Sequence, residues 1–132
     1  MTKVSLTNGQ LVYSKYGNGA EILIAFHGFG QDKKIFESWE HKLSEKYTIY
    51  AIDIFYHGDS TKELGDLTKT EWKSILSHLL DQENIVQFSI LGYSLGGRFA
   101  ISSSLAFPEK VRELILIAPD GIFLTIWFKL AT

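Results

Sequence analysis

The chain has 132 residues, of which 45% are hydrophobic, and carries a formal net charge of −2. This length suits one domain that buries roughly two thirds of its unfolded surface. The basic residues are scattered, so we expect no nucleic-acid partner. The absence of cysteine excludes disulfides and thiolate metal sites. We see no signal peptide, and the longest apolar stretch, 121–128, is shorter than the roughly 20 residues of a membrane span. We therefore expect a cytoplasmic protein with no membrane partner.

The first elements are predicted to be a hairpin and a buried strand. Residues 4–6 and 11–16 lie on either side of Asn8-Gly9, a pair that suits a two-residue turn with positive φ angles. Residues 22–26 form a continuous apolar run, which is typical of a strand covered on both faces of a sheet. The sequence thus predicts a hairpin followed by an interior strand.

A helix and a second buried strand follow. Asp32 is placed to cap the helix, and Phe36, Trp39 and Leu43 recur along one side of it. Residues 48–53 then read as a strand of the same interior kind as 22–26.

The next helix has a clear start signal and a clear apolar face. Thr68 and Glu71 have the spacing of a capping box, in which each side chain bonds a free backbone donor of the other residue. Behind them, apolar residues recur at helical spacing; they are Trp72, Ile75, Leu76, Leu79 and Leu80. This stripe predicts a helix packed on the core.

The last elements surround a short glycine-flanked motif. A buried strand is predicted at 88–91, then a helix that begins near Ser94, packs Leu95, Phe99 and Leu105 and ends by Pro108. Residues 111–118 form another apolar strand. Strands and helices therefore alternate after the hairpin, which predicts an α/β fold with a mostly parallel sheet and helices on both faces.

Residues 92–96 read Gly-Tyr-Ser-Leu-Gly and match the G-x-S-x-G pattern of a nucleophile elbow. Such a serine lies on a sharp strand-to-helix turn, which exposes its hydroxyl above the sheet. Its position between a predicted buried strand and a predicted helix favours a nucleophilic role for Ser94 over that of an ordinary turn serine.

Two earlier motifs, together with the elbow, resemble the α/β-hydrolase fold family of serine hydrolases. Residues 27–30 read His-Gly-Phe-Gly directly after a buried strand, and are similar to the H-G-x-G loop of that family. Residues 53–60 are similar to its D-x-P-G-H-G-x-S stretch, although Phe55 and Tyr56 replace the usual proline and first glycine. The resemblance covers the chain from the hairpin to Asp120.

The resemblance implies hydrolysis of a small-molecule acyl substrate, such as an ester or thioester, without a cofactor. Ser94 would be the nucleophile, and the backbone N–H groups of Phe29 and Leu95 would form the oxyanion hole. The residues implied to shape the loops are His27, Gly28, Gly30, Gly92 and Gly96. Phe29 and Tyr93 are also open to a role in lining an apolar acyl pocket.

The usual catalytic triad is not completed by this sequence. In the family the acid and then the histidine follow the nucleophile, whereas every histidine here precedes Ser94. Asp120 is a candidate acid, with a simple turn role as the favoured alternative. For His27 a structural role is favoured over that of a replacement base. No pair of histidines has ligand spacing, so we expect no metal site.

Residues 1–120 are therefore interpreted as the N-terminal part of an α/β-hydrolase core, without its lid and last strands. Residues 121–132 would be the apolar start of a lid segment. We expect the chain alone to be weakly active or inactive. The alternative is a non-catalytic binding or assembly module, whose open sheet edge and apolar terminus would be covered by a second copy or by a complementing chain.

Overall fold

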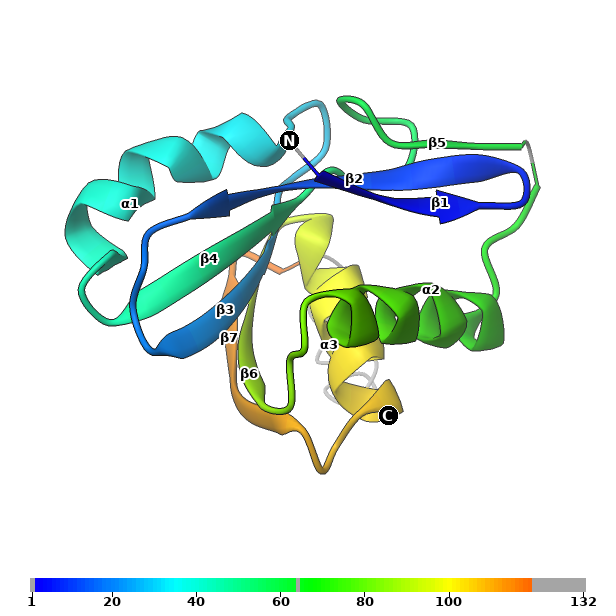
Figure 1. The fold of residues 1–132 in the computed structure, drawn as a ribbon. Coiled ribbons are helices and arrows are strands. Elements are labelled where there is room, and N and C mark those ends of the chain that lie inside the picture. Colours follow the sequence, from blue (N-terminus) through cyan, green and yellow to red (C-terminus); the bar gives the residue numbers. More distant parts are fainter. Residues whose placement is uncertain (1, 64, 120–132) are drawn as a thin grey trace, which may run out of the picture.

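The computed structural model describes residues 2–63 and 65–119, and this part of the chain forms an α/β fold (Figure 1). The strands are β1 (Thr2–Leu6), β2 (Gly9–Tyr16), β3 (Glu21–Phe26), β4 (Tyr47–Ile52), β5 (Thr61–Lys62), β6 (Phe88–Tyr93) and β7 (Val111–Ile117). The helices are the 3₁₀ turn η1 (Lys33–Phe36), α1 (Glu37–Leu43), α2 (Lys69–Gln82) and α3 (Gly96–Ala106).

The described strands form one mixed sheet in the order β1-β2-β4-β3-β6-β7, with β5 paired to β2. The four strands from β4 to β7 in this order run parallel, whereas β1, β2 and β5 pair antiparallel. Phe26 of β3 lies opposite Ile52 of β4 and Gly92 of β6. The carboxyl ends of these three strands are therefore level, so the loops that follow them gather at one edge of the sheet.

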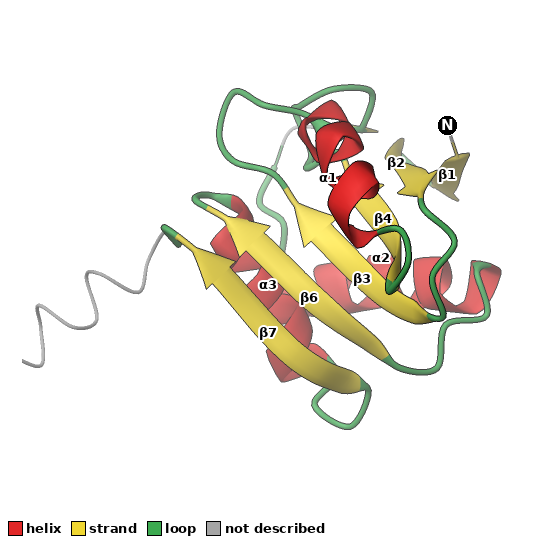
Figure 2. Cartoon of the chain, turned by 90° about the vertical axis from the view of Figure 1, so that its left-hand side faces the viewer, coloured by secondary structure: helices red, strands yellow, loops and turns green. Residues whose placement is uncertain are grey.

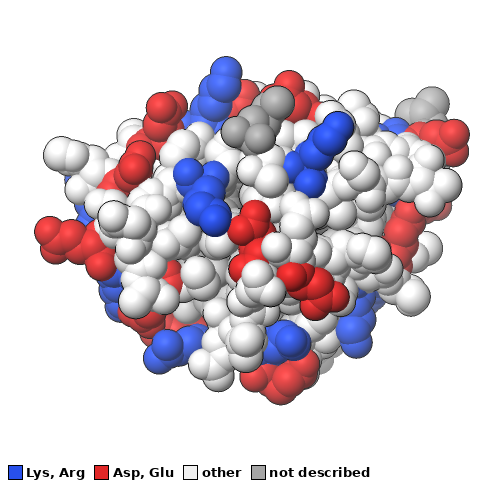
Figure 3. Space-filling model, in the orientation of Figure 1, with Lys and Arg blue, Asp and Glu red and all other residues white. Residues whose placement is uncertain are grey.

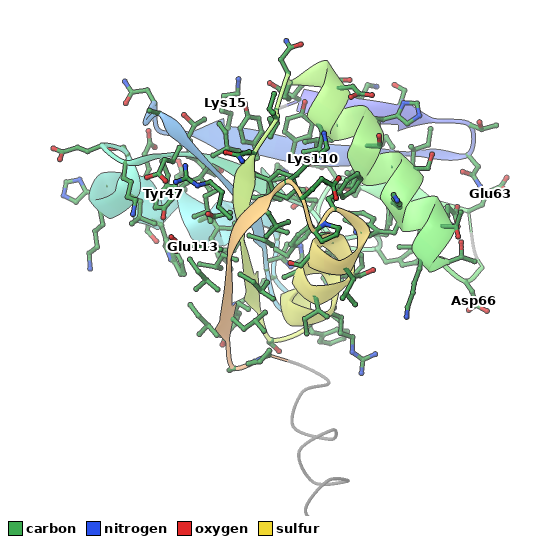
Figure 4. The ribbon with its side chains drawn as sticks, turned by 90° about the horizontal axis from the view of Figure 1, so that it is seen from below. Lys15, Tyr47, Glu63, Asp66, Lys110 and Glu113 are labelled. Atoms are coloured by element: carbon green, nitrogen blue, oxygen red, sulfur yellow. The ribbon has the colours of Figure 1, made fainter. Side chains whose placement is uncertain are left out.

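Helices cover both faces of the sheet, as the sequence predicts. In Figure 2, α1 lies in front of the strands and α2 and α3 lie behind them; Figure 4 shows the same two sides from below. Alternate residues of β3 serve the two sides: Ile24 and Phe26 join the core under α2 and α3, and Leu23 and Ala25 join the core under α1. The predicted stripe of α2, from Trp72 to Leu80, is buried in the larger core.

The hairpin forms, but its turn lies one residue earlier than predicted. Leu6 pairs with Gly9, so Thr7 and Asn8 make the turn, and Gly9 is the first residue of β2. Neither Asn8 nor Gly9 has a positive φ. A Cβ on Gly9 would lie 2.0 Å from the carbonyl oxygen of Thr61. Close approach of β5, rather than turn geometry, therefore requires glycine at this position.

Two helical details also differ from the prediction. Leu105 of α3 is 72% exposed, because the buried side of this helix is made of small residues; they are Gly96, Gly97, Ala100 and Ser103. The first predicted helix begins as the 3₁₀ turn η1, whose Lys34 N–H donates to the capping Asp32 side chain at 2.8 Å. Thr68 caps α2 as predicted, by accepting from the Glu71 N–H at 3.0 Å. The reciprocal half of the capping box does not form among the described residues, because the Glu71 side chain pairs with Lys62 at 3.5 Å.

Charged side chains of both signs are mixed over the face drawn in Figure 3. Within the described ranges, no helix is long and apolar enough to cross a membrane.

Candidate active site

Ser94 occupies a sharp turn between β6 and α3, at the carboxyl edge of the sheet. Its φ is +52°, a left-handed conformation that residues other than glycine adopt only at a cost. Two backbone hydrogen bonds fix the turn: the Ser94 N–H donates to the Ile117 carbonyl at 3.0 Å, and the Gly97 N–H donates to the Ser94 carbonyl at 2.9 Å. The turn therefore has the strand–serine–helix geometry of a nucleophile elbow.

The two flanking glycines are required by close contacts. A Cβ on Gly92 would lie 2.6 Å from the Gly96 carbonyl oxygen and 2.8 Å from the Ala100 Cβ. A Cβ on Gly96 would lie 2.2 Å from the carbonyl oxygen of Phe26, at the end of β3. Helix α3 thus begins directly against the sheet, and only glycine at both positions leaves room for it.

The His27 ring braces the loop after β3. Its Nε2 accepts a hydrogen bond from the Ile54 N–H at 3.0 Å, so the proton is on Nδ1, which lies 2.8 Å from the Gly28 carbonyl oxygen. Burial lowers the pKa of His27 and outweighs the bond to Gly28, which raises it. Because both ring nitrogens already have backbone partners, His27 is placed as a brace rather than as a base for Ser94.

The two amides predicted to form an oxyanion hole lie in loops at the same sheet edge. Phe29 follows β3, and Leu95 is the N-cap of α3. Within residues 2–63 and 65–119, neither amide N–H donates a hydrogen bond. Gly28 and Gln31 hold the first loop, since the Gln31 side chain accepts from the Gly28 N–H at 2.9 Å. The Phe29 side chain is 81% exposed, and its ring edge contacts the His57 ring.

The loop after β4 is organised by a buried ion pair that the sequence did not reveal. Asp53 is fully buried, and its Oδ2 lies 2.7 Å from the Nζ of Lys33, which is 4% exposed. Lys33 Nζ also lies 2.9 Å from Asp59 Oδ2. In the sequence Lys33 stands beside Lys34, and such a pair is usually solvated. Asp53 in the D-x-P-G-H-G-x-S-like stretch is the one signal that could have prompted a search for its partner.

Two predicted features fall outside the described residues, and a further histidine, His57, lies beside the site. Asp120 and the apolar segment 121–132 lie outside the described residues. His57 is half-buried, with its Nδ1 3.2 Å from the Phe55 carbonyl oxygen and its ring centroid 5.1 Å from that of His27. In the described part of the chain, no three His, Asp or Glu side chains are grouped as metal ligands would be.

Comparison with known proteins identifies the family. The family model for the alpha/beta hydrolase fold matches residues 21–131. The chain is 30% identical over 112 residues to the dihydrolipoyllysine-residue acetyltransferase component of the acetoin cleaving system of Cupriavidus necator, covering 83% of this chain and 29% of that protein. It is also 30% identical over 113 residues to the pimeloyl-[acyl-carrier protein] methyl ester esterase of Aliivibrio fischeri, covering 86% and 42%.

A solved esterase from a marine microorganism has the same arrangement, with a TM-score of 0.71 and 29% identity over 80% of this chain and 40% of the esterase. The chain thus spans less than half the length of each of these three proteins. The matched region contains β3, the elbow and the loops that face it. The chain therefore belongs to the α/β-hydrolase fold family, with which its sequence motifs and its mixed sheet agree.

Proposed function

We propose that this chain is the N-terminal part of a serine hydrolase that acts on an ester, thioester or related acyl bond, with Ser94 as its nucleophile. The observation that carries the proposal is the Ser94 backbone, held at a φ of +52° between β6 and α3. The hydrolase family and the esterases among its relatives support a hydrolytic reaction. For the substrate of the whole protein, we propose only that it contains such an acyl bond.

In the proposed reaction, Ser94 Oγ attacks the acyl carbonyl carbon while its proton passes to a base. The negative oxygen that forms would accept hydrogen bonds from the N–H groups of Phe29 and Leu95, both without a partner among the described residues. The alcohol or thiol then leaves with a proton, and water hydrolyses the acyl-serine. Loss of one oxyanion donor typically slows such reactions about 100- to 1000-fold.

The activation of Ser94 by a base is the step of the proposed reaction to which the residues of this chain contribute least. No histidine follows Ser94 in the sequence, and both nitrogens of His27 are already hydrogen bonded. A serine hydroxyl without a base is a weak nucleophile. We therefore expect the isolated 132-residue chain to react slowly or not at all with ordinary esters.

A fluorophosphonate probe tests the nucleophile directly, because Ser94 Oγ would form a bond to phosphorus as fluoride leaves. The full chain is incubated with the probe, and the adduct is measured by intact mass. We expect slow labelling of one site. Ser94→Ala should abolish it, whereas Ser104→Ala, which changes a serine farther along α3, should leave the labelling rate unchanged.

Equal labelling of the chain and of Ser94→Ala would contradict the assignment of the nucleophile. A well-folded chain that takes no label even at high probe concentration would contradict an activated Ser94 in this chain.

A second candidate function is an assembly module, and it is favoured by the edge of the sheet. Strand β7 pairs only with β6 among the described strands, and lies at the outer edge of the sheet in Figure 2. Its Leu114 and Ile117 are each 40% exposed. We propose a second copy of the chain as the partner, and sedimentation velocity tests it: a stable dimer supports the module, and a monomer at all concentrations contradicts it.

A further inference from the structure

The loops after β3 and β4 are joined by an ion pair that is almost completely shielded from water. Asp53, the first residue after β4, accepts three hydrogen bonds. They come from the Lys33 N–H to Oδ1 at 2.7 Å, from Lys33 Nζ to Oδ2 at 2.7 Å and from the Asp59 N–H to Oδ2 at 2.9 Å. Lys33 thus contacts both oxygens of one carboxylate and reaches Asp59 as well, at 2.9 Å.

A second connection, a hydrogen bond, joins the same two loops at the start of the loop that follows β3. The Ile54 N–H donates to His27 Nε2 at 3.0 Å, directly after β3. Residues 28–32 therefore lie between two fixed points, His27 and Lys33, and both points are anchored to the loop after β4. Phe29, whose N–H is one of the two proposed oxyanion donors, belongs to this bracketed segment.

The Lys33 side chain is needed because Asp53 is fully buried. A buried carboxylate is stable only when a cation and hydrogen bonds compensate it, and Lys33 is the cation seen on Asp53 among the described residues. Burial acts to lower the pKa of Lys33, but the bonds to Asp53 and Asp59 outweigh it and leave that pKa above its ordinary value. Lys33 is therefore charged at neutral pH, and the pair is an ion pair.

We propose that Lys33 is a positioning residue for the oxyanion hole: its ion pair with Asp53 fixes the 27–32 loop so that the Phe29 N–H points toward the carbonyl oxygen of a substrate on Ser94. The proposal rests on the proposed serine-hydrolase function. Lys33 acts through the loop and does not itself contact substrate. A displaced donor loses most of its effect on rate, because stabilisation of the oxyanion requires the donor at hydrogen-bond distance.

The test compares the full chain with Lys33→Met, in which the tether is lost, and Lys33→Arg, in which a cation is retained. Because Lys33→Met leaves Asp53 unpaired and could fail to fold, the double variant Lys33→Met/Asp53→Asn removes both charges. Backbone ¹⁵N relaxation reports the order of residues 28–31. We expect the Phe29 order parameter to fall from about 0.85 to below about 0.6 in the folded Met variants, and to recover in Lys33→Arg.

Fluorophosphonate labelling supplies the chemical readout. In the Met variants we expect the bond-forming rate constant to fall about 10- to 100-fold while the concentration for half-saturation stays the same. Glu83→Gln is the matched control, because Glu83 pairs with Lys15 at 3.2 Å at the far end of α2. It should lower stability without changing Phe29 order or the labelling rate.

An ordered Phe29 and an unchanged rate in the double variant would overturn the positioning role and leave Lys33 with a structural one. If the wild-type chain takes no label, the proposal of an activated Ser94 in this chain fails, and the order parameters still decide whether Lys33 fixes the loop.

Discussion

The His27 side chain couples protonation to folding, because its ring is buried and neutral. Burial lowers its pKa in the folded chain below the ordinary value of 6.5. The unfolded chain therefore binds a proton at a higher pH than the folded chain does, and the stability that the neutral ring contributes is lost as pH falls below about 6.5. We expect the free energy of unfolding to decrease by up to about 1.4 kcal/mol per pH unit as the pH falls below 6.5.

Urea unfolding at a series of pH values measures this slope. His27→Gln should remove it, whereas His78→Gln, at an exposed position on α2, should leave it unchanged. Asp59 and Glu83 also have lowered pKa values, but these carboxylates lose their contribution only below their ordinary values near 4, outside this window. An equal slope in His27→Gln and in wild type would contradict the assignment to His27.

At this scale the sequence predicts residues whose role is set by their neighbours in the chain. The turn at Ser94 is one example, because the glycines at 92 and 96 already specify it, whereas its role as nucleophile stays a prediction. Lys33 is the opposite case: its role depends on Asp53, twenty residues away, and nothing local distinguishes it from the exposed Lys34. Oxyanion assignments for Phe29 and Leu95 stay predictions.

Between α2 and α3, one buried hydrogen bond supports the packing of the two helices. Trp72 Nε1–H donates to Ser103 Oγ at 2.9 Å, and Ser103 Oγ–H donates to the Phe99 carbonyl at 2.6 Å. Ser103→Ala would leave the buried indole N–H without an acceptor. We expect a loss of about 1–3 kcal/mol of unfolding free energy, measured by urea denaturation.

Ser104→Ala is a close control, since the bond that Ser104 Oγ–H makes among the described residues is to the Ala100 carbonyl of its own helix, at 2.9 Å. It should change stability by less than about 0.5 kcal/mol. Equal losses in the two variants would mean that the bond to Trp72 contributes nothing to the packing.

Elements whose apolar spacing is strong were predicted well, and elements shaped by distant contacts were not. The five-residue stripe of α2 lies in the core as expected. The hairpin turn lies one residue earlier than predicted, because Gly9 is required by the close approach of β5 and not by the turn. Strand β5 has two residues, too few to form a recognisable pattern in the sequence. Leu105 was wrongly expected in the core, because α3 presents its small residues to the sheet.

For the molecule as a whole, the exposed side chains of β7 decide how copies would associate. If a second copy adds to this edge, Leu114→Lys should prevent it, because a lysine on an edge strand opposes further pairing. We expect the sedimentation coefficient to shift to that of a monomer. Val86→Lys, which replaces a 74% exposed residue between α2 and β6, should leave association unchanged.

The alternation of strands and helices predicts a mostly parallel sheet, and the structure confirms it. The alternation of strands and helices does not, however, predict the order of the strands in the sheet. Residues 23–26 of β3 pair with residues 89–92 of β6. The apolar runs of the sequence resemble one another, so the sequence does not indicate which of the distant runs will pair. The division of the chain at residue 120 stays a prediction, since the second segment lies outside the described residues.

Because the backbone at Ser94 is left-handed, stability and the proposed activity favour different residues at this position. Glycine adopts that conformation freely, so Ser94→Gly should add about 0.5–1 kcal/mol of stability and raise Tm by a few degrees. A library selected only for heat resistance would therefore be expected to accumulate glycine there. If Ser94 is the nucleophile, as proposed, a library selected for turnover would retain serine. The residue found at position 94 would then show whether heat resistance or turnover had been selected.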